Sequence, residues 1–113
     1  MHEMSLAEGI LAIVEQQRAQ SPFGCVKSIE LEIGELAGVE LESLLFSLDA
    51  VFKHSVADGA EVRVERLPGL AHCFNCDSEV PLSRRGESCP RCGGFQLHLI
   101  GGSEMRVKSL EVE

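Results

Sequence analysis

The sequence predicts an α+β fold, in which two helices pack on a small three-stranded mixed sheet and a cysteine-rich module is inserted before the last strand. Two observations predict it. Helical and strand-like apolar spacings alternate through the first 67 residues, and two Cys-x-x-Cys pairs then separate them from a final strand-like run. With 113 residues and 44% hydrophobic content, the chain is long enough for one modest core plus a small module stabilised by a metal ion.

The first helix is predicted to begin after residue 5. Ser5 and Glu8 have the spacing of a capping box, ahead of the apolar positions Leu6, Ile10, Ile13 and Val14. Residues 1–4 are therefore expected to lie outside the helix, with unpaired backbone amides. The segment Ser21-Pro22-Phe23-Gly24 should end the helix.

The next segments predict a strand, a second helix and a second strand. Ile29, Leu31 and Ile33 alternate with glutamates up to Gly34, as in a half-buried strand. A wide apolar stripe then predicts a helix that ends at Gly59, through Leu41, Leu44, Leu45, Leu48, Val51 and Phe52. Val62 and Val64 predict a strand closed by Pro68-Gly69.

Residues 104–112 predict the last strand. Its apolar positions change phase, from Met105 and Val107 to Leu110 and Val112, which indicates a bulge or a change of face.

The two cysteine pairs, Cys73/Cys76 and Cys89/Cys92, have the spacing of a structural zinc site, because each pair can direct two thiolates to one tetrahedral ion. Twelve residues separate the pairs, and we expect them to form a compact loop with little secondary structure. A disulfide framework and a dithiol redox motif are the alternative interpretations. The remaining Cys25 is expected to be a buried structural thiol.

These elements predict two domains. The first is an α+β domain of residues 1–67 plus 103–113, and the second is an inserted zinc module of residues 68–102. The segments Leu67-Pro68-Gly69 and Gly101-Gly102-Ser103 are candidate hinges between them.

Charge and hydropathy exclude several functions. The net charge is −8, and residues 1–67 hold five Lys/Arg against twelve Asp/Glu, which disfavours nucleic acid and suits metal cations, a basic protein surface or simple solubility. No apolar run is long enough to span a membrane. The N-terminus has no charged start followed by an apolar core, so we expect a cytoplasmic protein.

The N-terminus offers a second kind of metal site. The terminal amine of Met1, the ionised amide of His2 and the His2 ring nitrogen can close two fused chelate rings in one plane, with the Glu3 amide or another side chain as a fourth donor. Nitrogen donors in a square plane favour Ni(II) or Cu(II) over zinc. The alternative interpretation is that His2 is an incidental residue of a frayed terminus.

The whole pattern resembles the hydrogenase and urease maturation nickel metallochaperones of the HypA/HybF family. The resemblance covers nearly the full chain. It is carried by Met1-His2-Glu3-Met4-Ser5, by Gly34-Glu35-Leu36, by the four cysteines, and by the ending Glu104-Met105-Arg106-Val107-Lys108-Ser109-Leu110-Glu111-Val112.

The resemblance implies a non-enzymatic carrier that binds Ni(II) as cargo and passes it to a [NiFe]-hydrogenase large-subunit precursor, or to urease, with a partner GTPase. It implies His2 as the main side-chain ligand beside Met1 and the Glu3 backbone, and Glu40 as a further carboxylate near the metal. It also implies Cys73, Cys76, Cys89 and Cys92 as ligands of structural Zn(II). We do not expect His54, His72 or His98 to bind nickel, and we expect a monomer with strand exchange as a route to dimers.

A zinc-ribbon module that binds nucleic acid or protein is the alternative class, with Arg84, Arg85 and Arg91 as phosphate contacts. The acidic charge and the absence of Tyr and Trp argue against nucleic acid. A third possibility is redox sensing by the zinc thiolates.

Overall fold

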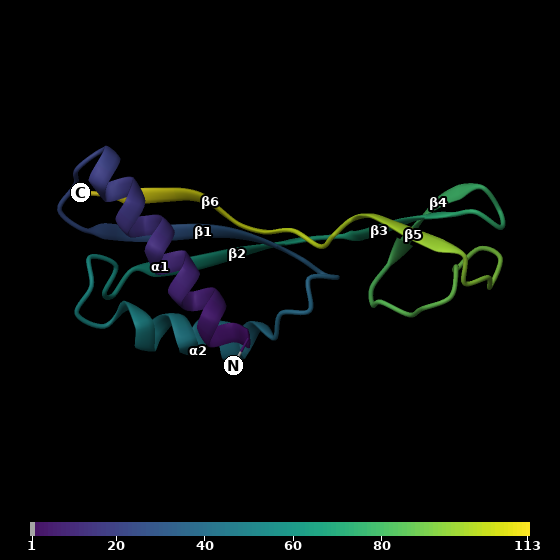
Figure 1. Cartoon of the computed structure of the whole chain (residues 1–113), viewed down its shortest axis with the longest axis horizontal. Coiled ribbons are helices and arrows are strands. Elements are labelled where there is room, and N and C mark those ends of the chain that lie inside the picture. The colour runs from purple at the N-terminus through teal and green to yellow at the C-terminus, as the bar shows by residue number, and fades with distance from the viewer. Residues whose placement is uncertain (1) are drawn as a thin grey trace. The chain divides into compact units, whose positions relative to one another are not determined.

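The structure is a computed structural model that describes residues 2–113. Over this range it has two helices and six strands (Figure 1): α1 (His2–Gln20), β1 (Val26–Gly34), α2 (Leu41–Phe52), β2 (Glu61–Leu67), β3 (Gly69–Cys73), β4 (Ser78–Leu82), β5 (Leu97–Gly101) and β6 (Met105–Val112). The strands form two three-stranded sheets, in the orders β2-β1-β6 and β4-β3-β5. The α+β class is confirmed.

The chain divides into two compact units. Unit 1 comprises the described residues up to Leu31 together with Val39–Val64 and Val107–Glu113. Unit 2 comprises Glu32–Gly38 and Glu65–Arg106. Both predicted hinge segments, 67–69 and 101–103, lie inside unit 2.

The first sheet is the predicted mixed one. The Glu35 amide donates to the Leu67 carbonyl at 2.9 Å, which places the ends of β1 and β2 together, as in a parallel pair. The Glu113 amide donates to the Cys25 carbonyl at 3.0 Å, so β6 ends where β1 begins and runs antiparallel to it. The sheet therefore combines one parallel and one antiparallel neighbour around β1.

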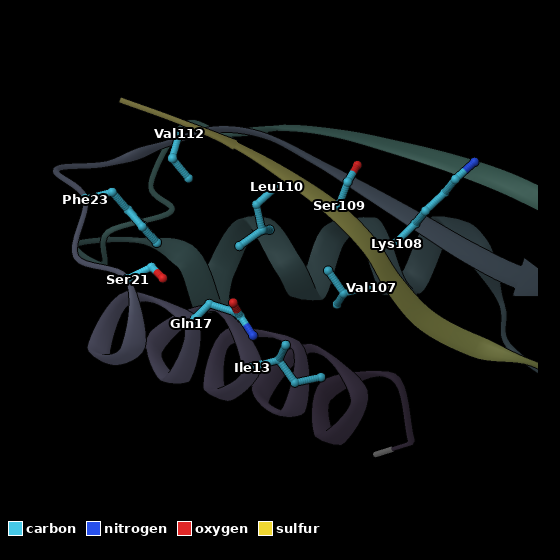
Figure 2. A pocket seen from close by; sticks show the side chains of 9 residues that line it. All are labelled: Ile13, Gln17, Ser21, Phe23, Val107, Lys108, Ser109, Leu110 and Val112. Carbon is cyan, nitrogen blue, oxygen red and sulfur yellow. The ribbon is translucent and has the colours of Figure 1, made fainter.

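The core of unit 1 is formed by one face of each helix and by β1. Its buried side chains are Ala7, Ile10 and Val14 of α1, Leu44, Leu48 and Phe52 of α2, and Val26, Ile29 and Leu31 of β1. Figure 2 shows both helices beneath the strands, so they cover the same side of the sheet. Among residues 2–113, neither α1 nor α2 has the combined length and apolar composition of a membrane span.

The predicted start of α1 is wrong. The helix includes residues 2–4, so Ser5 is an internal residue and not its cap. A tertiary contact favours the longer helix, because the Glu3 carboxylate accepts a hydrogen bond from the Glu40 amide at 3.3 Å, and a carboxylate in the first turn also suits the helix dipole.

The predicted end of α2 is also wrong. The helix ends at Phe52 and not at Gly59, because His54 adopts a left-handed φ of 63° and its amide donates to the Asp58 carboxylate at 2.9 Å. That side chain closes a turn in place of another helical turn.

Cys25 is exposed, contrary to the prediction of a buried thiol. Its Sγ donates to the Glu113 carboxylate at 3.5 Å, where β1 begins and β6 ends.

Unit 2 contains a second, antiparallel sheet that was not predicted. Strand β4 occupies part of the segment between Cys76 and Cys89, where we expected little secondary structure. The physical reason is a short alternation, in which Val80 and Leu82 turn inward and are buried beside Ala71 and Leu36. Cys73 and Cys89 belong to the same core.

Three glycines allow backbones to approach closely within unit 2. A Cβ on Gly34 would lie 1.9 Å from the Gly102 carbonyl oxygen, and a Cβ on Gly102 would lie 2.5 Å from the Gly69 Cα. Any other residue at these positions must push one backbone away from another, because both contacts involve main-chain atoms.

We therefore expect Gly34→Ala to lower the free energy of unfolding by about 2–4 kcal/mol, since no flexible side chain can move aside. Urea unfolding of zinc-loaded protein, followed by circular dichroism, measures the effect. The control is Gly9→Ala in α1, where the added Cβ meets nothing within 4 Å. It should leave stability unchanged or raise it by up to about 1 kcal/mol. Equal stability of the two variants would contradict the packing argument.

Candidate metal centres

The four cysteines of the two pairs converge in unit 2. Cys73 ends β3 and Cys76 follows in the next turn, whereas Cys89 and Cys92 lie in the loop between β4 and β5. The Sγ atoms of Cys73 and Cys92 are 3.6 Å apart, those of Cys76 and Cys89 are 3.8 Å apart, and all four lie within 4.8 Å of one another. Four thiolates around Zn(II) at about 2.3 Å form a tetrahedron with edges of about 3.8 Å. The cluster fits a zinc site in both spacing and donor type.

Backbone and side-chain donors surround the sulfurs of the second pair. The Asn75 side-chain amide donates to Cys92 Sγ at 3.3 Å, and the Gly94 backbone amide donates to it at 3.4 Å. The Arg91 backbone amide donates to Cys89 Sγ at 3.4 Å. Such donors stabilise thiolates, the form in which cysteine binds a metal.

These hydrogen bonds and the burial of the site shift the pKa values of three of the thiols in different directions. The pKa of Cys92 is lowered to about 6, first by the Asn75 amide and then by the Gly94 amide. Burial acts to raise the pKa of Cys89, but the amides of Cys92 and Arg91 outweigh it and the pKa is lowered. Burial raises the pKa of Cys76 to about 11, and the Cys73 thiol adds to that shift. A metal ion must therefore displace a proton from Cys76.

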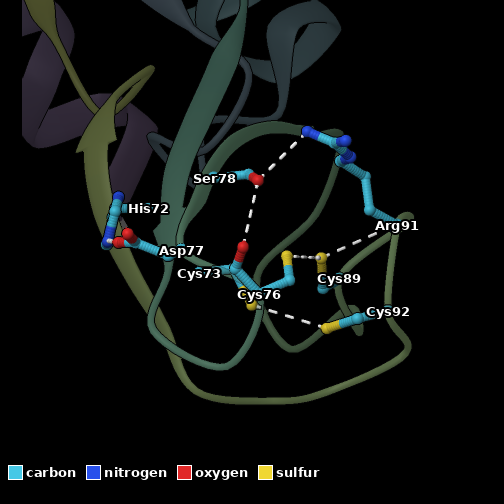
Figure 3. A network of polar contacts seen from close by, with 8 residues as sticks. All are labelled: His72, Cys73, Cys76, Asp77, Ser78, Cys89, Arg91 and Cys92. Atoms are coloured by element: carbon cyan, nitrogen blue, oxygen red, sulfur yellow. Dashed lines mark hydrogen bonds and ion pairs between the residues drawn. The ribbon is translucent and has the colours of Figure 1, made fainter.

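A polar link joins the turns that carry the two pairs (Figure 3). The Arg91 guanidinium donates from Nη1 to Ser78 Oγ at 3.0 Å, and Ser78 Oγ donates to the Cys76 carbonyl at 3.2 Å. Cys73 and Cys89 are buried, at 0% and 2% exposed, so half of the cluster is closed to solvent. The arrangement suits a metal that stays in place.

The histidines beside the cysteines do not join the cluster. The His72 ring contacts Asp77, with Nε2 at 3.2 Å from Oδ1, and it packs edge-on against Phe74. His98 is exposed on β5, directly opposite His72 on β3. Among residues 2–113, no group other than the four cysteines brings three His, Cys, Asp or Glu ligand atoms together.

The second candidate site lies in unit 1, where the N-termini of α1 and α2 meet. The His2 ring is 59% exposed, and its Nδ1 lies 3.4 Å from the Glu3 carboxylate. Glu3 is mostly covered, and the same carboxylate oxygen accepts from the Glu40 amide. The structure thus brings together three of the predicted nickel-site residues. The fourth, Met1, lies outside the described residues.

The carboxylates of this site are held in their charged form. The Glu40 amide, followed by His2, lowers the pKa of Glu3. The Ser43 backbone amide, followed by its hydroxyl, lowers the pKa of Glu40, which caps α2 through a 2.7 Å hydrogen bond from that amide. The site carries negative charge beside an exposed imidazole, as a site for a cation requires.

Two contributors to the candidate metal sites were not predicted from the sequence. Asn75 was not singled out, although its place between Cys73 and Cys76 is a signal that its amide can reach a sulfur. The link from Glu3 to Glu40 was also missed, because it joins residues that are far apart in sequence.

Comparison with known families decides the identity. The family model described as "Hydrogenase/urease nickel incorporation, metallochaperone, hypA" matches residues 1–112. The chain belongs to the HypA family. It is 54% identical over 110 residues to a hydrogenase maturation factor HypA of Azoarcus sp., covering 97% of this chain and 96% of the relative. It is 50% identical over 113 residues to the one of Albidiferax ferrireducens, covering all of both chains.

Solved HypA structures share the fold. The solution structure of the nickel metallochaperone HypA from Helicobacter pylori matches with a TM-score of 0.69 and 19% identity, over 97% of this chain and 96% of that one. A second HypA solution structure matches with a TM-score of 0.68 and 20% identity, over 100% and 97%. The chain is therefore a member of the nickel metallochaperone family of hydrogenase maturation, with a four-cysteine metal site.

We expect Asn75→Ala to raise the pKa of Cys92, because the strongest donor to its sulfur is lost. Acid releases zinc by protonating thiolates, so the variant should lose zinc at a pH about half a unit higher than the parent. A chromogenic chelator, read during an acid titration, measures the midpoint. The control is Ser88→Ala, an exposed change one residue before Cys89. Identical midpoints for all three proteins would remove Asn75 from the site.

Proposed function

We propose that this protein is a nickel carrier that binds one Ni(II) at its N-terminus and delivers it to a [NiFe]-hydrogenase large-subunit precursor, with a partner GTPase. The observation that carries the proposal is the exposed His2 ring at the first turn of α1, backed by the Glu3 carboxylate. The proposed ligands are the Met1 amine, the His2 ring and the backbone amides of His2 and Glu3.

Helical structure at residues 2–4 is compatible with amide ligands. The first four N–H groups of an α-helix have no acceptor within the helix. The His2 and Glu3 amides therefore donate no hydrogen bond within the helix, although both residues are helical. Ni(II) can displace their protons, and square-planar nitrogen donors suit it.

The helix dipole opposes a cation at this end, and the two glutamates offset it. Glu3 lies against the imidazole, and Glu40 is joined to Glu3 through its amide. We propose that Glu3 positions His2, and that Glu40 is the candidate side chain for a further ligand.

The closed cysteine site has a different proposed role. Two buried cysteines, and hydrogen-bond donors to the sulfurs of Cys89 and Cys92, favour retention of zinc, whereas exposed nitrogen ligands favour exchange. We therefore propose structural Zn(II) at Cys73, Cys76, Cys89 and Cys92, in a zinc module of residues 68–102. The carrier site belongs to an α+β domain of residues 1–67 and 103–113.

The nucleic-acid alternative has weaker support, because its three arginines have partners in their own chain. Arg85 donates to the Leu36 carbonyl at 2.9 Å, Arg91 donates to Ser78, and Arg84 pairs with Glu87 at 3.9 Å. We propose a non-enzymatic protein of the reducing cytoplasm, where the thiols stay available to zinc. Urease is a second candidate acceptor, suggested by the family description.

We expect His2→Ala to abolish stoichiometric nickel binding without unfolding the protein, because the exposed ring makes no core contact. Calorimetric titration of untagged, zinc-loaded protein with a native Met1 terminus measures it. His54→Ala, which removes another exposed histidine, is the control and should bind like the parent. Retained binding in His2→Ala, or no binding by the intact protein, would refute the proposed carrier site.

Glu3→Gln should weaken nickel binding by about tenfold while keeping the stoichiometry, because the amide oxygen can still accept from Glu40 but the charge is gone. The same titration gives the affinity. Glu8→Gln, an exposed change further along α1, controls for the lost charge. An affinity equal to that of the Glu8 variant would show that Glu3 has no part in positioning the metal.

A further inference from the structure

Strand β6 is an unpaired edge of the first sheet. Among residues 2–113, β6 has β1 as its one neighbour in the order β2-β1-β6. Beside it lies a groove of about 410 Å³ in unit 1, lined by Ile13 and Gln17 of α1 and by Val107, Leu110 and Val112 of β6 (Figure 2). Ile13 and Val112 are 41% and 40% exposed, so the groove leaves apolar surface in contact with solvent.

The alternation of β6 breaks at its centre. Lys108 and Ser109 are both exposed, whereas Val107 and Leu110 on either side are both partly buried. Figure 2 shows Val107 and Leu110 pointing to the same side, toward α1, although they are three residues apart. In an unbroken strand, residues three apart point to opposite faces.

The sequence of β6 is complementary to its own reverse about this break. If two copies of the strand pair antiparallel with a two-fold axis between Lys108 and Ser109, Val107 faces Leu110 of the other copy. Met105 then faces Val112, and Arg106 faces Glu111. In this register each of these apolar side chains faces another apolar side chain, and the basic Arg106 faces the acidic Glu111.

The neighbouring registers lack this match. A shift of one residue in one direction places Lys108 opposite Lys108 and Arg106 opposite Leu110. A shift in the other direction places Val107 opposite Glu111 and Lys108 opposite Leu110. Both registers put a charge against an apolar side chain, which a sheet disfavours.

The break in alternation is the geometric condition for the matched register. A two-fold axis perpendicular to the sheet keeps each residue on the same face in both copies, and residues paired across strands must share a face. Val107 can therefore pair with Leu110 of a second copy if both point to one side of their own strand, as they do here.

We propose that a second copy of this chain covers the groove by pairing β6 with β6 in this register, which joins the two sheets into one of six strands. Arg106 already donates to Glu32 through Nε, and its remaining guanidinium donors can take Glu111 of the other copy. The two Lys108 ammonium groups lie near the axis, and each has Glu30 of its own chain at 3.3 Å. The apolar residues of both grooves are then brought to the same side of the joined sheet.

Sedimentation equilibrium of zinc-loaded protein over a concentration series tests the proposal, with Glu111→Lys and the matched control Glu15→Lys. Glu15 is an exposed residue of α1 and is not among the groove residues. The parent and the control should dimerise alike, and Glu111→Lys should weaken the dimer by about tenfold or more, because two base-acid contacts become like-charge contacts. Circular dichroism checks that each variant is folded.

Cross-linking provides the second measurement. Two Ser109 residues beside the axis would have Cα atoms about 6 Å apart, from the spacing and rise of antiparallel strands, which a disulfide spans. In a Cys25→Ser background, Ser109→Cys should form a disulfide-linked dimer under mild oxidation, and Glu15→Cys should not. A parent that stays monomeric at every concentration, equal dimerisation of the two lysine variants, or equal cross-linking of the two cysteine variants would overturn the proposal.

Discussion

The convergence of four sulfur atoms from two separate turns is the constraint on which the second sheet depends. Cys73 ends β3 and Cys89 follows β4, and both are buried in the same small core as Val80 and Leu82. A core of this size offers little apolar area, so a metal that ties the turns together contributes stability that side-chain burial does not supply. The hydrogen bonds from Asn75, Arg91 and Gly94 belong to the same arrangement, because they stabilise the thiolates that a metal needs.

The two candidate sites differ in burial and in ligand type, the properties that decide whether a bound metal is retained or exchanged. The cysteine cluster has two buried cysteines, and hydrogen-bond donors reach the sulfurs of Cys89 and Cys92. The site at the start of α1 has an exposed ring, free helix amides and a carboxylate whose position is set by a neighbouring helix. This contrast is the physical basis of the proposed division between a retained zinc and an exchanged nickel.

Strand β6, at the edge of the first sheet, is a proposed interaction surface separate from the two metal sites. Charged residues on an edge strand usually discourage pairing with other chains. In β6, the order of charged and apolar residues about the centre disfavours the two neighbouring registers and matches the proposed one. The same residues therefore combine protection against unspecific pairing with a specific self-complementary register.

The sequence by itself determined the elements whose signals are local. The alternation through Ile29 and Leu31, the apolar stripe of α2 and the spacing of the cysteines each predict structure from neighbours in the chain, and each is found. The change of phase in β6 was also readable from the order of its apolar residues. Tertiary structure decided the rest. The extra turn of α1 exists because Glu40, distant in sequence, donates to Glu3, and β4 forms because Val80 and Leu82 find a core beside Leu36 and Ala71. Contacts between distant residues have no local signature, so they override a capping box or a loop-like composition without leaving a trace in the sequence.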